Sequence, residues 1–248
     1  MTAVIGKVLQ IVDCLAADPC GPVSLADMTR RTGIPKPTLY RLLGDLLQPG
    51  IVEHGNSGYT LGRRLFELGV AAPRYGCIRD AARPHMEELL AATKETVHLA
   101  VLSGSEVLYL EKLHGISAVR IPTSVGARMP AHCTALGKVL LAHSEPSVVD
   151  DVLCHNLRRI TPYTVILPKM LQRQLDRARN DGVVTESEEA RLGLGCIAAV
   201  ILDRGRSPVA AISVAGNPRS TQSRTLALQV RRAADKFERD YMLAVSAA

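Results

Sequence analysis

The stretch "VSLADMTRRTGIPKPTLYRLLGDLLQPGIVEHGNSGYTLG", residues 23–62, decides the fold of the first part of the chain. Ser24 and Asp27 have the spacing of a capping box, which predicts a helix over 24–32. Gly33 suits the left-handed turn that commonly ends a helix. The stretch therefore begins with a short helix that is closed by a tight turn.

A second helix is expected directly after this turn, because Pro35 and Pro37 are tolerated only in a first helical turn. Its leucines follow the spacing of a buried stripe: Leu39, Leu42, Leu43, Leu46 and Leu47. The opposite face carries Thr38, Arg41, Asp45 and Gln48, flanked by Lys36, Tyr40 and Gly44. Two short helices joined by a glycine turn, the second cationic at its N-terminal end, indicate a helix-turn-helix.

The end of the stretch, "GIVEHGNSGYTLG", predicts two short strands around the turn "GNSG". A hairpin that follows a helix-turn-helix forms a wing. Before the stretch, the segment "VIGKVLQIVDCLAADP" places Val8, Ile11, Val12 and Leu15 on one helical face and stops at Pro19. Residues 1–72 are therefore expected to form a compact winged helix-turn-helix unit.

Four cations of this unit, Arg30, Arg31, Lys36 and Arg41, lie in a window over 28–44 that contains no acid. Such clustering favours contact with DNA phosphates. However, the unit as a whole has seven Lys and Arg against six Asp and Glu, and charged helix faces are often simply solvated. The residues alone leave both interpretations open.

Composition limits the protein class. The chain has 248 residues, of which 47% are apolar and 22% charged, as in globular proteins. No apolar run approaches the ~18 residues of a membrane span, and the N-terminus resembles an amphipathic helix rather than a signal peptide. We expect a cytoplasmic protein with no membrane partner. The six cysteines are scattered, so we expect no metal and no cofactor.

The second part of the chain mixes strands and helices. Residues 62–92 indicate a helix, a break at Pro73, and a longer helix that Pro84 should kink or restart. The segment "ETVHLAVLSGSEVLYLEKLHGISAVRI" alternates in the manner of an antiparallel meander. Helical segments "CTALGKVLLAHS" and "LPKMLQRQLDRARNDG" and buried strands "GCIAAVILD" and "SPVAAISVAG" follow, with a terminal helix near Ser220. This order indicates an α+β domain.

The sequence contains only weak indications of a catalytic site. His132 and Cys133 are adjacent, and adjacent side chains usually diverge, so a structural or ligand-lining role is favoured over a nucleophile. Glu186, Glu188 and Glu189 fit a solvated or salt-bridged acidic turn. The seven histidines show no metal-binding spacing. We therefore expect no catalytic residue and no enzyme.

A binding pocket is better supported. The segment "MPAHCTALGK" passes from an extended stretch into a helix, and free backbone N–H groups at such a start suit an anion, especially a carboxylate. Ala131, Ala135 and Leu136 would make the rest of that wall small and apolar. Met129, His132 and Cys133 belong to the same wall.

Three quoted stretches carry a resemblance to a known family. "LADMTRRTGIPKPTLYRLLGDLLQPGIVE…GYTLGRRLFELG", "GARMPAHCTALGKVLLA" and "DGVVTESEEARLGLGCIAAVILD…PVAAISVAG" together resemble the IclR family of bacterial transcription regulators, in the same order and over nearly the whole chain. The resemblance implies an α+β fold: a winged helix-turn-helix over 1–72, a linker helix over 73–92, and a GAF-like α+β sensor domain over 93–248 that binds an effector.

The resemblance also implies the site residues. Expected DNA contacts are Arg30, Arg31, Lys36, Thr38, Tyr40 and Arg41. The effector pocket is expected at Met129, Ala131, His132, Cys133, Ala135 and Leu136, with further lining from Glu186, Leu194, Cys196 and Ser213. The family often has Ser or Thr at Pro37, which here restricts Lys36 away from the α region and gives Arg41 and Thr38 more weight.

Two more differences concern the ligand. The family often has a polar residue at Ala215 and a larger apolar one near Ala118; both changes would widen or dry the pocket and favour a bulkier, aromatic ligand. The expected function is a transcription regulator that binds double-stranded operator DNA as a homodimer or tetramer, under control of a small carboxylate or aromatic-acid metabolite. The alternatives are an enzyme whose N-terminal domain only oligomerises and a small-molecule-binding adaptor without DNA.

Overall fold

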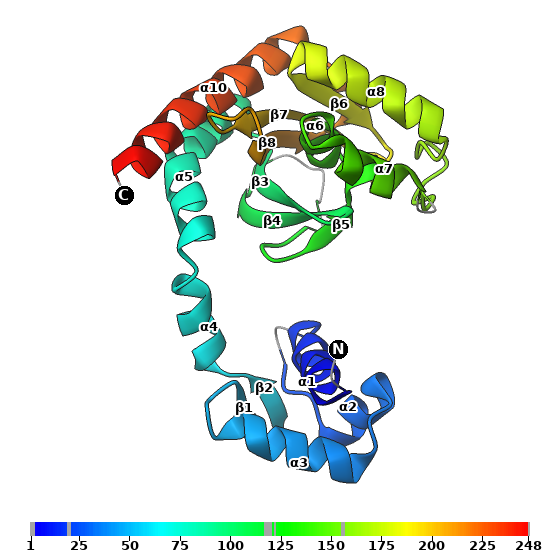
Figure 1. Cartoon of the computed structure of the whole chain (residues 1–248), viewed down its shortest axis with the longest axis vertical. Coiled ribbons are helices and arrows are strands. Elements are labelled where there is room, and N and C mark those ends of the chain that lie inside the picture. The colour runs from blue at the N-terminus through cyan, green and yellow to red at the C-terminus, as the bar shows by residue number, and fades with distance from the viewer. Residues whose placement is uncertain (1–2, 19–20, 117–120, 122, 155–156, 248) are drawn as a thin grey trace. The chain divides into compact units, whose positions relative to one another are not determined.

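The computed structural model describes residues 3–18, 21–116, 121, 123–154 and 157–247 (Figure 1). The chain divides into two compact units, Met1–Pro73 and Arg74–Ala248, which are described separately. Among the described residues, no helix combines the length and apolar character needed to cross a membrane.

The first unit is a winged helix-turn-helix. Its elements are α1 (Ala3–Ala16), α2 (Leu25–Thr32), α3 (Lys36–Leu47), β1 (Val52–Gly55), β2 (Gly58–Leu61) and α4 (Arg63–Val70). The predicted caps of α2 are confirmed: the Ser24 hydroxyl accepts the Asp27 amide at 3.1 Å, and Gly33 is left-handed at a φ of 68°. Helix α3 includes Lys36, so the expected exclusion of this residue from the α region is wrong. Pro37 falls in the first turn, where its missing N–H costs no helical bond.

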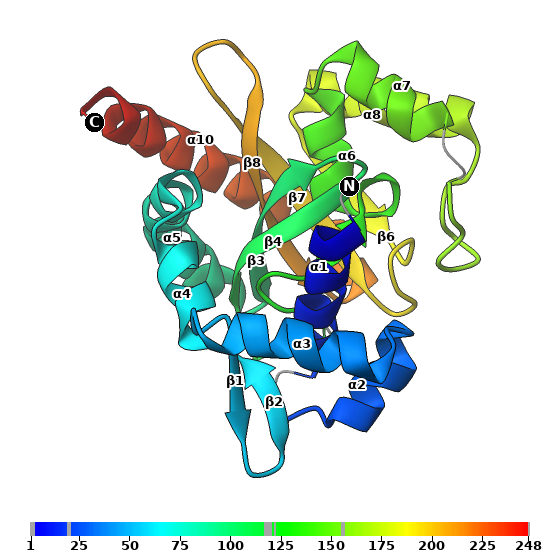
Figure 2. The same ribbon diagram turned by 60° about the horizontal axis from the view of Figure 1, so that its bottom comes forward.

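The core of this unit is aliphatic and lies where α1, α2 and α3 meet (Figure 2). Its main side chains are Ile11, Leu15, Met28, Leu39, Leu42, Leu43, Leu46 and Val52. The predicted stripe on α3 is confirmed except at Leu47, which is 37% exposed because the helix ends there. The hairpin is tied to the start of α2 through a bridge between Val23 and Tyr59. A Cβ at Gly58 would lie 2.6 Å from the Val23 carbonyl oxygen, so only glycine fits.

The second unit is an α+β sandwich around one sheet. Its helices are α5 (Pro73–Thr93), the short 3₁₀ helix η1 (Ala131–Cys133), α6 (Ala135–Ala142), α7 (Pro146–Cys154), α8 (Pro168–Asp181), α9 (Pro218–Thr221) and α10 (Arg224–Ala247). Its strands are β3 (Thr96–Ser103), β4 (Glu106–Leu113), β5 (Arg128–Pro130), β6 (Val183–Ser187), β7 (Gly195–Leu202) and β8 (Pro208–Gly216). The sheet order is β5-β4-β3-β8-β7-β6, and every neighbouring pair is antiparallel.

Helices cover both faces of this sheet, so its strands alternate between two cores. Helices α5 and α10 lie on one face, and α6 and α8 on the other (Figure 1). On β3, Val97, Leu99 and Val101 point to the first face, while Ala100 belongs to the core on the second. His98, between Val97 and Leu99, therefore shares the α6 face with Ala100.

The sequence predicted that Pro84 would kink or restart α5; the chain does not restart there but runs through the proline as one helix. The proline removes one backbone hydrogen bond. Ala82 and Met86 on either side are fully buried in the core beneath α5 and α10. Tertiary packing thus holds the helix together across the missing bond.

Candidate functional site

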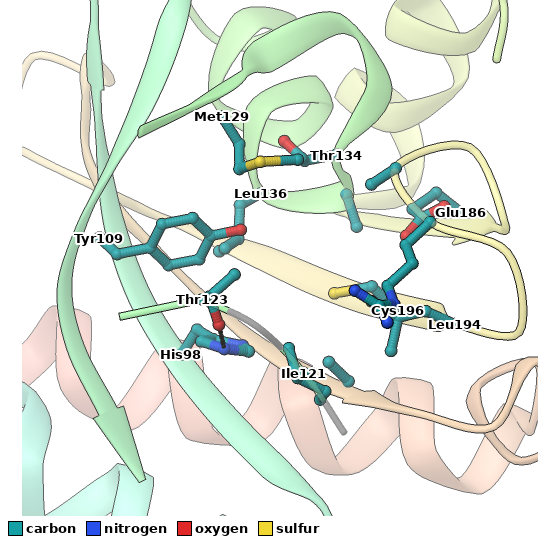
Figure 3. Close-up of a pocket in the computed structure, with 14 residues that line it drawn as sticks. His98, Tyr109, Ile121, Thr123, Met129, Thr134, Leu136, Glu186, Leu194 and Cys196 are labelled. Carbon is teal, nitrogen blue, oxygen red and sulfur yellow. Dashed lines mark hydrogen bonds between the residues drawn. The ribbon is translucent and has the colours of Figure 1, made fainter. Parts of the chain in front are cut away.

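A cavity of about 150 Å³ lies on the α6 face of the sheet in the second unit (Figure 3). Most of its wall is apolar, with a few polar groups. The lining residues are His98, Tyr109, Ile121, Thr123, Met129, Thr134, Ala135, Leu136, Glu186, Ala190, Arg191, Leu194, Cys196 and Ala215. A concave, mainly apolar space with a few convergent polar groups is typical of a small-molecule site.

The start of helix α6 forms one wall of this cavity. Thr134 is the N-cap residue, and its hydroxyl accepts the Gly137 amide at 3.0 Å. Helix α6 begins at Ala135, so the amides of Ala135 and Leu136 lie in its first turn, where the helix itself supplies no acceptor for them. A Cβ on Gly137 would come within 2.2 Å of the Ala131 carbonyl oxygen, so glycine is needed where η1 folds against α6. The wall therefore offers two uncommitted N–H donors beside the cavity.

A second wall carries neutral polar groups. The His98 Nε2 atom lies 2.8 Å from the Thr123 hydroxyl, and burial lowers the pKa of His98 to about 3, helped by the charge of Lys112. The Tyr109 ring meets the His98 ring edge-on at 5.2 Å, and burial also raises the pKa of the Tyr109 phenol. Lys112 donates to the carbonyls of Ile121 and Thr123, each at 2.7 Å, and so fixes that segment. The polar groups of this wall are uncharged and can form hydrogen bonds with a ligand.

The opposite side of the cavity contains Glu186, only 2% exposed. One of its oxygens accepts the Glu189 amide at 3.0 Å. Burial raises the pKa of Glu186 to about 7, with a further contribution from the charge of Glu189. Glu189 forms a buried ion pair with Lys138 of α6 and accepts the Val165 amide at 3.1 Å.

The expectation of an acidic turn is therefore only partly right. Glu189 is salt-bridged as expected, but Glu186 lies on strand β6 beneath α6, and a strand was not expected there. Glu188 adopts a positive φ of 60° at the end of β6 and accepts the Gly193 amide at 2.7 Å. These three carboxylates thus have three different environments.

Seven of the predicted pocket residues line the cavity: Met129, Ala135, Leu136, Glu186, Leu194, Cys196 and Ala215. Four others are buried nearby but do not line it: Ala131, His132, Cys133 and Ser213. Ala118 lies outside the described residues. Ser213 pairs with His98 in the register of β3 and β8, so the two side chains are neighbours on the same face of the sheet.

His132 and Cys133 do not line the cavity, and each side chain is engaged by a different backbone carbonyl. The His132 Nε2 atom lies 3.0 Å from the Arg158 carbonyl oxygen, while the Cys133 thiol donates to the Pro130 carbonyl at 3.5 Å. Burial raises the pKa of Cys133 to about 12, so the group is a thiol and not a nucleophilic thiolate. No cluster of side chains in the described ranges could hold a metal ion.

Sequence reasoning missed seven lining residues: His98, Tyr109, Ile121, Thr123, Thr134, Ala190 and Arg191. His98 and Tyr109 could have been recognised from the sequence as pocket candidates, because both are bulky hydrogen-bonding residues within apolar strands. The alternation of β3 and β4 could have placed them on one face. The side chains that reach the cavity from loops carried no comparable pattern.

The surface of α3 is the second candidate site. Lys36, Tyr40 and Arg41 are exposed, with Tyr40 at 68%, whereas Thr38 is half-buried between this surface and the leucine stripe. Arg41 lies 3.8 Å from Asp45. The exposed surface thus offers two cations and a phenol within little more than one helical turn.

The acid-free window seen in the sequence does not remain acid-free in the fold. Arg30 pairs with Asp27 at 2.6 Å, and Arg31 pairs with Asp18, which lies on the other side of the α1–α2 connection. Both carboxylates come from outside the window, which is why the linear pattern could not show them. Such exposed pairs are weak, because solvent and salt screen the two charges, so a phosphate can replace the carboxylate.

Three comparisons bear on both sites. Residues 75–239 match the family model for the bacterial transcriptional regulator IclR C-terminal, and residues 4–55 match the IclR helix-turn-helix domain. The crystal structure of an IclR homolog from Microbacterium hydrocarbonoxydans, complexed with 4-hydroxybenzoate, has a TM-score of 0.89 at 31% identity and covers 98% of this chain and 100% of that chain.

Curated relatives agree. The HTH-type transcriptional regulator KdgR of Dickeya chrysanthemi is 33% identical over 211 residues, which is 84% of this chain and 68% of that protein. The HTH-type transcriptional repressor AllR of Salmonella typhi is 33% identical over 199 residues, covering 79% and 73% of the two chains.

Proposed function

We propose a function for this chain, which belongs to the IclR family of bacterial transcriptional regulators. The chain binds an inverted-repeat operator. Its affinity for that DNA changes when a small aromatic acid or another carboxylic acid occupies the cavity under α6. The chain is a transcription regulator and not an enzyme, with a helix-turn-helix DNA-binding domain and an effector-binding C-terminal domain. Because its target is chromosomal DNA, the proposal places it in the cytoplasm.

The ligand class rests chiefly on the cavity wall at α6. The uncommitted amides of Ala135 and Leu136 suit a carboxylate, and the apolar remainder suits a ring. A cavity of about 150 Å³ matches the size of an engineered protein cavity that binds benzene. The similar IclR homolog was crystallised as a complex with 4-hydroxybenzoate, so this single-ring hydroxy acid is the first compound to test.

DNA binding is proposed to use α3 in the major groove. Arg41 and Tyr40 are exposed on its outer face, and Lys36 begins its first turn. Arg30 and Arg31 at the end of α2 are proposed to contact phosphate, which would displace their weak pairs with Asp27 and Asp18. The wing, β1 and β2, would lie beside the same groove.

The observation that carries the proposal is the presence of an exposed cationic recognition helix and a separate, ligand-sized cavity in one chain. The test is retardation of the chain's own upstream DNA, with and without 4-hydroxybenzoate and a panel of related acids. We expect a specific complex that weakens steeply with salt, because phosphate contacts release counterions. A flat salt response, or a complex that no acid in the panel alters, would contradict it.

We also propose assembly into at least a dimer, with one winged helix on each half-site. A two-fold protein matches an inverted repeat, and a lone winged helix buries little DNA surface. An effector then acts only if it binds one quaternary arrangement better than another. Sedimentation that shows only monomer at micromolar concentration, with and without DNA, would refute this arrangement.

A further inference from the structure

A second cavity, of about 170 Å³, lies in the sensor unit where the ends of α6 and α8 approach α10 and strand β7. None of its lining residues belongs to the cavity under the start of α6. Its wall is mainly polar and includes Arg179 of α8, Arg206 of the β7–β8 turn and Arg231 of α10. Three elements that are far apart in the sequence thus bring three guanidinium groups to one space.

Two of these arginines are held in place by backbone carbonyls. The Arg179 Nε–H group donates to the carbonyl of Ala142, the last residue of α6, at 2.6 Å. Arg231 donates to the carbonyl of Asp181, the last residue of α8. Capping a helix C-terminus is an ordinary structural role for arginine. However, each capping hydrogen bond uses only one of the five N–H donors of the guanidinium group and holds the other four in a fixed position.

The charges of these arginines are not neutralised by ion pairs. Over the described residues, no carboxylate lies within 4.0 Å of the guanidinium nitrogens of Arg179, Arg206 or Arg231. Two carboxylates do line the cavity, Asp235 and Glu238, and Glu238 is engaged by the Leu202 amide at 2.9 Å. Three permanent cations therefore face two carboxylates across the cavity.

His143 also lines this cavity, where the charges of the arginines act on its ring. Its Nδ1 atom lies 3.0 Å from the Val139 carbonyl oxygen, and its ring lines the cavity. Burial lowers the pKa of His143 most, and the charges of Arg179 and Arg206 lower it further, while the Val139 carbonyl and the charge of Glu238 act in the opposite direction. Two of the three arginines therefore lie close enough to this ring to act on its charge.

We propose that this second cavity is an anion-binding site that takes a small oxyanion, either a phosphate group or the carboxylate of a metabolite, between Arg179, Arg206 and Arg231. Planar guanidinium groups bind both kinds of oxyanion through paired N–H donors. The site is independent of the effector cavity. An anion there would join the end of α8 to α10 and the β7–β8 turn.

The test is isothermal titration of the full-length protein at constant ionic strength, with inorganic phosphate in one arm and succinate in the other. Two variants remove donors from the cavity: Arg231→Gln and Arg206→Asn. Arg206 has a positive φ of 66°, and asparagine tolerates that conformation. The matched control is Arg177→Gln, which removes an exposed cation of α8 that does not line the cavity.

We expect saturable binding of at least one probe, weakened about tenfold or more by each cavity variant and unchanged by the control. The arm that binds identifies phosphate or carboxylate as the preferred group. Ala135→Phe, which fills the other cavity, should leave this binding intact, so failure of the effector proposal would be seen separately.

Two results would overturn the proposal. One is no saturable binding of either probe at millimolar concentration. The other is an equal loss in Arg177→Gln, which would indicate attraction by net charge alone. Arg231 also packs against Gly182, so its replacement could disturb α8. Circular dichroism checks this, and Arg206→Asn then decides the question alone.

Discussion

Lys138 should be among the most costly side chains in the sensor unit to remove. It is 1% exposed and forms an ion pair with Glu189, itself 6% exposed. Replacing Lys138 by methionine keeps the shape of the chain but leaves the Glu189 charge buried and unpaired. Breaking such a pair typically costs about 3–5 kcal/mol. Because natural domains are stable by only about 5–15 kcal/mol, Lys138→Met should leave this unit marginal.

The double variant Lys138→Met with Glu189→Gln tests the reason for that cost. Glutamine carries no charge and can still accept the Val165 amide, so the double variant should be more stable than Lys138→Met alone. The matched control is Lys236→Met, whose partner Glu88 lies 2.7 Å away in an exposed pair; there the loss of stability should be far smaller than in Lys138→Met, because solvent screens the pair.

The assay is urea denaturation followed by circular dichroism, with hydrogen exchange of the α6 and β6 amides to locate the loss of stability. The reasoning would be refuted if Lys138→Met behaved like the exposed control. It would also be refuted if the double variant were no more stable than the single one.

Three further predictions follow from the two candidate sites. Arg41→Ala should weaken operator binding by about 1–3 kcal/mol in fluorescence anisotropy at matched salt and leave the melting temperature unchanged; equal affinity would exclude α3 as proposed. Ala135→Phe should weaken effector binding at least about tenfold, or 1.4 kcal/mol, while operator binding survives; a large fall in melting temperature with lost operator binding would instead indicate core overpacking. Because folding raises the pKa of Glu186 from 4.5 to about 7, the folded state binds this proton more tightly, so the free energy of unfolding should fall by up to about 3 kcal/mol as the pH rises from 4.5 to 7. Urea midpoints across this range measure it, and Glu186→Gln should flatten the slope; an unchanged slope would assign the effect elsewhere.

Local signals in the sequence were sufficient for the first unit. The cap at Ser24, the left-handed Gly33 and the leucine stripe of α3 are all determined within a few residues of each other, and all appear in the structure. There are two exceptions: Leu47 is exposed because the helix ends there, and Lys36 lies in α3 although a proline follows it.

The sensor unit was harder, because its decisive contacts join distant residues. Lys138 is a charged residue in an otherwise apolar helix, and its partner Glu189 is 51 positions away. The sequence around Glu186 does not predict that β6 packs beneath α6 and buries this residue. The part of the cavity formed at the start of α6 was predictable because that wall is local, whereas the wall of His98 and Tyr109 depends on strand pairing.

The two faces of the sheet carry alternate side chains of the same strands. On β3, β7 and β8 the residues that line the cavity under α6 alternate with those packed under α5 and α10, such as Cys196 beside Ile197 and Ala215 beside Val214. A substitution at Cys196 or Ala215 therefore leaves the core beneath α5 and α10 in place and alters only the core on the α6 side, to which both residues belong. Under the proposed function, ligand preference can change at these alternate positions while the core beneath α5 and α10 stays the same, and a designed library for a new biosensor should randomise those positions alone.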